Sequence, residues 1–381
     1  MDDRRVIQIA QPDTGEEEWL ALREPLESGW LTQGPKVAAF ERAFAERHAV
    51  PHALATTSCT TALHLILAAL RIEPGDEVIV PAFTWVSTAN AVLYCGATPV
   101  LADVRRDTFN LDPEDVARRV TPRTRAIIAV HLFGLCADME AIAAVAPGIP
   151  IVEDAACAAG AAWHGRPAGS LGIAGAFSFH PRKSITTGVG GMVTTADSML
   201  AERANMLRNH GASISEEQRH LGPKPYLLAD FNLLGFNYRM TDLQGAVGLV
   251  QLRKLDRYID ERAARAAWYS EALADLPWLT TPSAPAHARH GWQSYVCMVD
   301  EAIAPLSRNA IMEQLLAAGV STRPGTHAVH MLGVYRDRYG FLPEDFPGAR
   351  DCDRLSISIP LHNRMDDSQY AQVVAALKSI G

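Results

Sequence analysis

Short apolar runs alternate with helix-like segments from about residue 50 to residue 200, and this alternation constrains the fold more than any other feature. The runs lack a polar face, so we expect strands that are buried on both sides. Such strands, alternating with helices, form a parallel or mostly parallel sheet covered on both faces. The predicted strands are residues 78–80, 99–101, 126–130, 149–152 and 176–179, and the predicted helices are 60–70, 84–94, 112–119 and 138–146.

The rest of the chain predicts a second, smaller α+β unit. The segment TDLQ at residues 241–244 fits a capping box and starts a long helix that reaches about residue 273. We therefore expect a large domain of residues 1–250, with an N-terminal arm of residues 1–30, and a small domain of residues 251–381. Within the small domain we predict a loop at 277–290, a strand at 294–299 and helices at 308–318 and 367–380.

Composition excludes several classes of partner. The net charge of the 381 residues is −8, and no cluster of lysine and arginine predicts a nucleic-acid surface. No apolar run approaches the roughly 20 residues of a membrane helix, and the N-terminus leads into no apolar signal core. The six cysteines are scattered without a CxxC pair, so we expect no metal site, no disulfide framework and a reducing, cytoplasmic setting.

One lysine stands between a predicted strand and a glycine-rich turn. Lys183 follows the apolar strand ending at Phe179 and precedes TTGVGG at residues 186–191. Burial disfavours the ammonium form of lysine and makes the amine a nucleophile that can form a Schiff base with an aldehyde cofactor. The alternative is an ordinary turn lysine in solvent.

Carboxylates end another predicted strand, where ligands of such sheets bind. Glu153 and Asp154 close a buried run, and deep carboxylates are costly unless paired, so one of them should have a cationic partner. An aspartate in this place can keep the pyridine nitrogen of pyridoxal 5'-phosphate (PLP) protonated. Capping of the next helix is the alternative role.

Two further strand ends offer binding groups. Residues 56–63 (TTSCTTAL) open an apolar helix, whose free N–H groups and positive dipole end suit a phosphate. Simple capping by Ser58 or Thr60 is compatible with that role. Trp85, after the following strand, offers a face on which a planar ring can stack, or else belongs to the core.

Along the chain these features follow one another as phosphate turn, aromatic platform, strand-end aspartate, strand-end serine (Ser178) and lysine. This order resembles the DegT/DnrJ/EryC1/StrS family of sugar aminotransferases. The resemblance runs from about residues 32–35 (TQGP) to 360–362 (PLH) and is most specific at 153–156, 178–191 and 235–241. It implies the α/β fold of PLP-dependent transferases of fold type I, as in aspartate aminotransferase. That fold has a large domain with a mostly parallel, seven-stranded type of sheet flanked by helices, and a smaller α+β C-terminal domain.

The resemblance also implies roles for single residues. Lys183 would form the internal aldimine with PLP and shuttle the proton, and Asp154 would pair with the pyridine nitrogen. Trp85 would stack on the ring of the cofactor. The phosphate would be held by the backbone of Cys59 and Thr60, the Ser178 hydroxyl and Asn237. Asn237 would come from the second subunit of a homodimer with shared sites.

Four residues are expected near the substrate. Arg239 would meet a substrate carboxylate or diphosphate across the dimer interface. His330 matches a histidine that the family keeps near the substrate pocket. His180 would lie close to the cofactor, in a structural or a catalytic role, and Arg323 would either meet a diphosphate or lie in a surface turn.

The chain departs from the family pattern at two positions. Cys157 stands where the family usually has a glutamine or histidine that bonds the phenolic oxygen of the cofactor, and a thiol is a weak donor. Val189 replaces the acid of the usual Gly-Glu-Gly-Gly turn. Both changes would alter the spectrum or pKa of the aldimine, or the fit of the substrate, without touching the essential lysine.

The implied reaction is a ping-pong transamination. The amino group would pass from L-glutamate or glutamine, through Lys183 and PLP, to a keto sugar such as a nucleotide-diphosphate 4-keto- or 3-keto-6-deoxyhexose. One alternative is a non-nucleotide cyclic ketone such as an inosose, because fold analogy does not settle the substrate. A sugar dehydratase would have histidine in place of Lys183, and a regulatory homologue would have no physical reason to keep that lysine.

Overall fold

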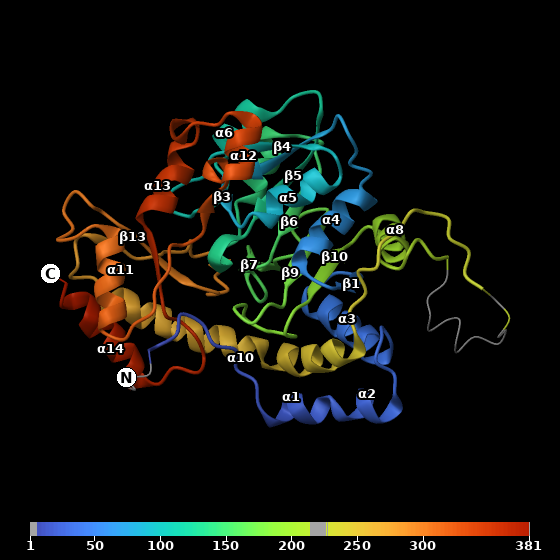
Figure 1. Ribbon diagram of the computed structural model, residues 1–381, viewed down its shortest axis with the longest axis horizontal. Helices are drawn as coiled ribbons and strands as arrows, with labels where there is room; N and C mark the ends of the chain where they lie inside the picture. Colours follow the sequence, from blue (N-terminus) through green and yellow to red (C-terminus); the bar gives the residue numbers. More distant parts are fainter. Residues whose placement is uncertain (1–5, 214–225, 227, 381) are drawn as a thin grey trace.

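A seven-stranded sheet forms the centre of the molecule (Figure 1). The computed structural model describes residues 6–213, 226 and 228–380. Strand β10 pairs antiparallel with β1 and β9, whereas the remaining pairs are parallel, which confirms the predicted α/β class. In spatial order the strands are β1 (His52–Thr56), β10 (Gly191–Thr195), β9 (Ala174–Ser178), β6 (Ile151–Asp154), β5 (Thr124–Val130), β2 (Glu77–Pro81) and β4 (Thr98–Ala102).

Helices cover both faces of the sheet, because successive side chains of a strand point to opposite sides. On one face Ala176 packs with residues of α4, α5 and α8, and on the other face Phe177 packs with residues of α3 and α10. No helix of the described residues is long and apolar enough to cross a membrane. The helices around the sheet are α3 (Pro35–Arg47), α4 (Cys59–Ala69), α5 (Ser87–Tyr94), α6 (Pro113–Arg119), α7 (Met139–Val145) and α8 (Ser198–Arg208).

The structure differs from the predicted elements at several helices and at short or glycine-rich strands; helices α3 and α8, for example, were not predicted. Neither β1 nor β10 was predicted, since the glycines before Gly191 are typical of a turn. Helix α5 begins three residues late, because β3 (Phe83–Thr84) pairs with β14 (His327–Ala328). The predicted loop at 277–290 contains two short strands, β11 (Leu279–Thr280) and β12 (Ala288–Arg289), and β12 pairs with β7 (Ala162–Trp163), which pairs with β8 (Arg166–Pro167).

A second core lies in the C-terminal part of the chain. Helix α10 (Asp242–Ala272) starts at the predicted capping box, in which Thr241 Oγ1 accepts from the Gln244 amide. It runs unbroken through residue 250, so the division between the two domains stays a prediction. The second core is built from α10, a three-stranded sheet of β11, β13 (Tyr295–Val299) and β15 (Ser356–Ile359), and the helices α11 (Arg308–Ala317) and α14 (Asp367–Lys378).

Helices α12 (Gly333–Tyr339) and α13 (Pro347–Leu355) lie at the outer edge of the large sheet, near β3 and α6 (Figure 1). Tyr335 of α12 donates a hydrogen bond to Asn90 of α5, and residues of both helices belong to the core of the large sheet. Part of the C-terminal chain therefore covers the large domain. Short 3-10 helices lie at Leu132–Gly134, Val329–Met331 and Pro343–Asp345.

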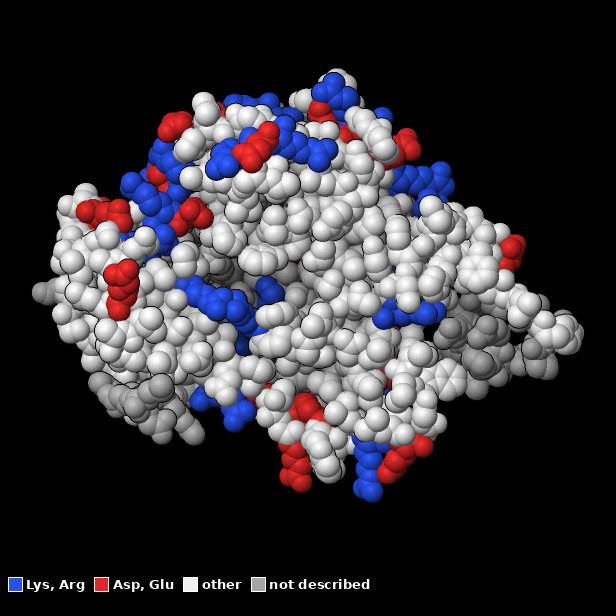
Figure 2. Space-filling view, viewed as in Figure 1, with Lys and Arg blue, Asp and Glu red and all other residues white. Residues whose placement is uncertain are grey.

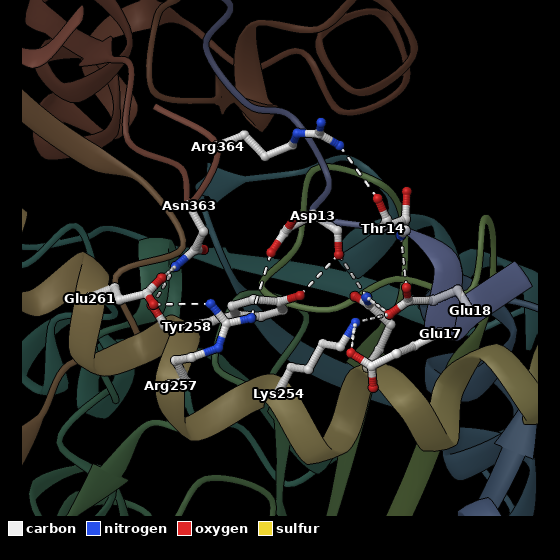
Figure 3. Close-up of polar contacts among 12 residues, drawn as sticks. Asp13, Thr14, Glu17, Glu18, Lys254, Arg257, Tyr258, Glu261, Asn363 and Arg364 are labelled. Carbon is white, nitrogen blue, oxygen red and sulfur yellow. Dashed lines mark hydrogen bonds and ion pairs between the residues drawn. The ribbon is translucent and has the colours of Figure 1, made fainter. Parts of the chain in front are cut away.

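The N-terminal arm lies along α10 (Figures 1 and 3). Its helices are α1 (Glu16–Ala21) and α2 (Arg23–Ser28). Glu18 is buried and accepts hydrogen bonds from the side chains of Gln251 (2.7 Å) and Lys254 (2.8 Å). The carbonyl of Asp13 accepts from the Tyr258 hydroxyl at 2.9 Å. These buried polar contacts fix the arm to the long helix.

Candidate active site

The carboxyl end of β6, the start of α4 and the turn after β9 bring several predicted site residues together at one edge of the sheet. Cys59 Sγ lies 3.9 Å from Asp154 Oδ1 and donates to the carbonyl of Ala176 at 3.5 Å. Lys183 Nζ lies 3.1 Å from Cys157 Sγ. Lysine, aspartate and two thiols thus form one cluster, as expected for residues that follow neighbouring parallel strands.

Asp154 is buried at the bottom of this cluster, with an exposed fraction of 5%. Its Oδ2 accepts from the Thr88 hydroxyl at 2.8 Å, and its Oδ1 accepts from the Ala156 amide at 3.2 Å. Burial raises the pKa of Asp154, while these hydrogen bonds and the Lys183 charge oppose the rise. A ligand that brings a cationic N–H to this carboxylate would therefore be favoured.

Glu153 points to the other face and has a structural role. It accepts from the amides of Gly169, Leu171 and Gly172 at 2.6–2.7 Å, and lies 2.8 Å from His131 Nε2. Nδ1 of His131 accepts from the Ala137 amide, so Nε2 is the nitrogen that donates to Glu153. This carboxylate is satisfied by four hydrogen bonds rather than by a lysine or arginine, so of the two carboxylates it is Asp154 that feels the charge of Lys183.

The pKa of Lys183 depends on its charged neighbours as well as on its burial. Burial alone would lower the pKa of Lys183, but Cys157, Cys59 and Asp154 outweigh it and raise the pKa above its ordinary value. In the protein without PLP these neighbours therefore oppose the effect of burial on the amine. The Lys183 amide donates to the His180 carbonyl at 2.8 Å, which fixes the turn that carries the side chain.

The predicted phosphate turn has a closely packed backbone. Ser58 caps α4, since its Oγ accepts from the Thr61 amide, and the amides of Cys59 and Thr60 lie in the first turn, where a helix supplies no acceptor. Gly191 of β10 lies against this turn, because a Cβ there would be 2.7 Å from the Cys59 nitrogen. Ser178 is the register partner of Gly191, so its hydroxyl belongs to the same edge.

Trp85 is exposed and does not belong to the core. Its side chain is 59% exposed, and its ring centroid is 5.5 Å from that of His327. The pairing of β3 with β14 brings these two rings together. Arg323 is exposed, and its backbone is bridged to Ser358 of β15.

Asn237 and Arg239 lie on the chain just before α10. Asn237 is exposed and its backbone forms a bridge with Asn209. Arg239 Nη1 donates to Asn209 Oδ1 at 2.6 Å. The carbonyl of Tyr238, between them, accepts from the Thr57 amide at 3.0 Å, so this segment borders the phosphate turn from outside.

The two predicted histidines differ in exposure. His330 has no exposed surface, and its ring packs 5.0 Å from that of Phe346, so burial lowers its pKa. Because it has no exposed surface, it cannot touch a substrate in this conformation. His180 is exposed, its Nδ1 accepts from the Arg182 amide, and burial, Lys183 and Arg182 together lower its pKa.

Sequence reasoning missed Thr88, His131 and Gly191. Thr88 follows the predicted aromatic platform by three residues, and nothing local indicates that it reaches Asp154. His131 directly follows the predicted strand 126–130, so its strand-end position was the available signal. Gly191 belonged to a segment interpreted only as a turn.

Comparison with known proteins agrees with this geometry. Residues 12–378 match the model of the DegT/DnrJ/EryC1/StrS aminotransferase family. The chain is 40% identical over 372 residues to the spore coat polysaccharide biosynthesis protein SpsC of Bacillus subtilis (strain 168), which covers 97% of this chain and 95% of SpsC.

Solved structures show the same fold over almost the whole chain. DesV of S. venezuelae, in complex with a ketimine intermediate, has a TM-score of 0.86 and 35% identity, with 95% of this chain and 94% of DesV covered. Spr1654 of Streptococcus pneumoniae, named as a sugar aminotransferase and solved in its PLP form, has a TM-score of 0.90 and 28% identity, with 98% of each chain covered.

PLP is the cofactor of these relatives, and the residues present here fit it. An amine, a deep carboxylate and a helix start stand where the aldehyde, the pyridine nitrogen and the phosphate of PLP need partners. The missing Cβ of Gly191 leaves room for the turn at Ser58 and Cys59. The chain belongs to the DegT/DnrJ/EryC1/StrS family and is a PLP-dependent sugar aminotransferase.

Proposed function

We propose that this enzyme moves the amino group of L-glutamate or glutamine to a keto sugar carried on a nucleoside diphosphate, in two half-reactions at one site. The sugar would be a 4-keto- or 3-keto-6-deoxyhexose. The observation that carries the proposal is the cluster of Lys183 with Asp154, Cys59 and Cys157 at the sheet edge. The name of SpsC supports an amino sugar destined for a polysaccharide.

When bound, PLP supplies the aldehyde that takes up the amino group and a ring that spreads negative charge from the substrate carbon. Asp154 would keep the ring nitrogen protonated, and Thr88 orients that carboxylate through its 2.8 Å hydrogen bond. Lys183 would move the proton at the reacting carbon, as base in one half-reaction and as acid in the other.

The remaining residues would hold and orient the cofactor. The amides of Cys59 and Thr60, with the Ser178 hydroxyl, would bind the phosphate. Trp85 would stack on one face of the ring, since its side chain is exposed and not part of the core. Cys157 contacts Lys183 and would adjoin the phenolic oxygen as a weak donor.

We further propose a homodimer in which Asn237 and Arg239 reach the phosphate and the substrate of the partner subunit. Both residues lie in a segment that runs past the phosphate turn, and Asn237 is exposed. Residues 1–250 would form the large domain and 251–381 the small one. All six cysteines are free thiols, which supports a reducing, cytoplasmic location.

Isotope transfer tests the proposal. The purified holoenzyme is incubated with L-glutamate carrying labelled nitrogen and with a thymidine-diphosphate 4-keto-6-deoxyhexose. We expect the label in a nucleotide amino sugar, detected by mass spectrometry, and none with Lys183→Ala. Parallel reactions use amide-labelled and amine-labelled glutamine, a 3-keto isomer and an inosose. Label appearing only in the inosose product would contradict the nucleotide-sugar assignment.

A further inference from the structure

A thiol lies in contact with the amine of the catalytic lysine. Cys157 Sγ is 3.1 Å from Lys183 Nζ. The family usually has glutamine or histidine in the place of Cys157, so this pair of nucleophiles comes from a departure of this chain from the family pattern. As a cofactor contact the thiol would be only a weak hydrogen-bond donor, and its redox chemistry has no part in transamination.

Backbone hydrogen bonds fix both turns that carry the pair. Cys157 lies in the turn after β6, where the Ala155 amide donates to the Ala176 carbonyl of β9 at 2.9 Å. In the turn after β9, the Lys183 amide donates to the His180 carbonyl at 2.8 Å. Strands β6 and β9 are parallel neighbours, so the turns after them meet at one edge of the sheet. The contact between sulfur and nitrogen therefore follows from the fold.

The pair is open to small solutes. All six cysteines lie in the described part of the chain, and four of them are buried, whereas Cys95 and Cys157 are partly exposed. Lys183 is partly exposed as well. Figure 2 shows a hollow in the middle of the face it presents, with Lys and Arg side chains along it, in the region where Figure 1 draws β9.

The surroundings of the thiols differ in a way that decides their reactivity. Burial raises the pKa of Cys95 to about 11, and burial together with Asp154 raises the pKa of Cys59 well above its ordinary value. Those two thiols stay protonated near neutral pH and react slowly with oxidants. Cys157 has an amine at its sulfur, and a cation beside a thiol favours the thiolate, which is the form that peroxide oxidises.

We propose that Cys157 and Lys183 form an oxidation site, at which peroxide joins the two side chains through a sulfur–nitrogen bond and removes the catalytic amine until a thiol reduces the bond. Peroxide transfers one oxygen atom to the thiolate, so that an S–O bond forms and the O–O bond breaks. Sulfur gives up the electron pair that reduces peroxide, and the hydroxide left behind takes the ammonium proton of Lys183 as water.

The second step closes the link. The neutral amine attacks the sulfur of the sulfenic acid, the N–S bond replaces the S–O bond, and the hydroxyl group leaves with an amine proton as a second water. One peroxide is consumed, and the product is a sulfenamide. Two equivalents of an external thiol return the free thiol and the free amine and form a disulfide of their own.

The first step prepares the amine for the second. Burial lowers the pKa of Lys183, and Cys157 is the largest of the effects that raise it. Conversion of the thiolate to a neutral sulfenic acid removes that negative charge, so burial then favours the neutral amine. PLP joined to Lys183 occupies the amine, so the pyridoxamine form of the enzyme is the form open to this oxidation.

Peptide mapping of the oxidised enzyme tests the site. Protein loaded with pyridoxamine 5'-phosphate is treated with dilute hydrogen peroxide, free thiols are alkylated, and the digest is analysed by mass spectrometry. We expect a Cys157–Lys183 peptide pair that is lighter by two hydrogen atoms than its free peptides together and that dithiothreitol separates. Protein loaded with PLP should give no such pair. Cys95→Ser, at a partly exposed thiol outside the site, is the matched control and should link like wild type.

Two variants show whether the amine traps the oxidised sulfur. Lys183→Ala has no amine at this place, so its Cys157 should pass on to the sulfinic acid, which dithiothreitol does not reverse. Cys157→Gln has the glutamine usual in the family and should give no link. In wild type, added PLP should restore no visible band after oxidation until dithiothreitol has released the lysine.

Several outcomes would overturn the inference. It fails if wild-type Cys157 reaches the sulfinic acid while Lys183 stays free, or if Cys157 forms a disulfide with Cys59. Equal linking in the PLP form would also overturn it, because the amine is not free there. A link that keeps one oxygen atom between sulfur and nitrogen, formed with a second peroxide, joins the same two side chains and supports the site.

The oxidation site and the proposed function fail separately, because the pyridoxamine form is supplied directly and neither donor nor acceptor enters the experiment. If labelled nitrogen reaches a keto sugar but no linked pair forms, aminotransfer stands and the oxidation site falls. If the pair forms but no nucleotide sugar takes up the label, the oxidation site stands and the acceptor assignment falls.

Discussion

The two adjacent carboxylates at the end of β6 point to opposite faces of the sheet and have different partners. Asp154 faces the lysine and thiols, with two hydrogen bonds, whereas Glu153 accepts from three backbone amides and His131. The alternation of a strand predicts that only one of them faces the ligand. Which partner each one has depends on residues as distant as Thr88 and His131, and no local pattern indicates those.

Glu153→Gln tests the structural role. The amide group would turn a donor toward buried donors, so we expect a loss of about 3–5 kcal/mol in the free energy of unfolding, typical of a broken buried charge network. Urea unfolding of wild type and variant measures it. A loss below about 1 kcal/mol, within the range of an ordinary surface substitution, would show that Glu153 does not organise the turn at residues 169–172.

Asp154→Asn should have the opposite effect on the protein without PLP. Burial raises the pKa of Asp154 in the folded protein above its ordinary value of 3.8. The folded protein therefore loses stability as the pH rises from the ordinary pKa through the raised pKa, because the carboxyl group has to ionise while it is buried. At pH 7 the variant, which cannot ionise, should unfold at higher urea than wild type, yet show no aminotransfer. Equal midpoints for the two proteins at pH 7 would contradict a raised pKa.

At the scale of elements, Gln251 of α10 connects the N-terminal arm to the turn that carries the catalytic lysine. Its Nε2 donates to Glu18 and to the Asp13 carbonyl, and its Oε1 accepts from the Thr186 amide, three residues after Lys183. Figure 3 shows the arm contacts around Glu18. The helix α10 was predicted from its cap, but this connection was not, because its members lie far apart in the sequence.

Gln251→Leu should uncouple the arm from the turn. It leaves buried polar groups without partners, so we expect a loss of about 2–3 kcal/mol in unfolding free energy. We also expect faster loss of PLP on dialysis. Gln372→Leu, at an exposed glutamine of α14, is the matched control. PLP retention equal to wild type in Gln251→Leu would show that the arm does not support the lysine turn.

The arm should also loosen in acid. Burial raises the pKa of Glu18, but Lys254, Gln251 and the Gly15 amide outweigh it, and the pKa lies below its ordinary value of 4.5. The stabilisation is therefore complete above pH 4.5 and is lost as the pH falls through the lowered pKa. Hydrogen exchange of residues 6–21 should rise over that range in wild type, and Glu18→Gln should remove this pH dependence. The same pH dependence in the variant would assign it to another group.

At the scale of the whole molecule, the order of strands and helices was largely predictable, because buried strands and capped helices have local signals. β10 and the two-residue strands were not, since pairing with distant strands defines them. Lys183 and Asp154 could be chosen from their positions after strands. The burial of His330 against Phe346 was not predictable, because it depends on how the C-terminal part of the chain packs.

Subunit mixing tests the proposed shared site. Lys183→Ala and Asn237→Ala are each expected to be inactive or nearly so as homodimers. In a mixed dimer one site has both defects and the other has neither, so random exchange should restore about a quarter of wild-type activity. Activity that stays at the sum of the two variants would show that Asn237 serves its own subunit.

The central claim is that Lys183 carries out the donor half-reaction with PLP. The most direct measurement is the absorption spectrum of the purified holoenzyme before and after L-glutamate, beside Lys183→Ala. We predict a visible band in wild type that glutamate converts to the pyridoxamine form, and no such band in the variant. A wild-type band that neither glutamate nor glutamine changes, or a variant that converts like wild type, would contradict the account.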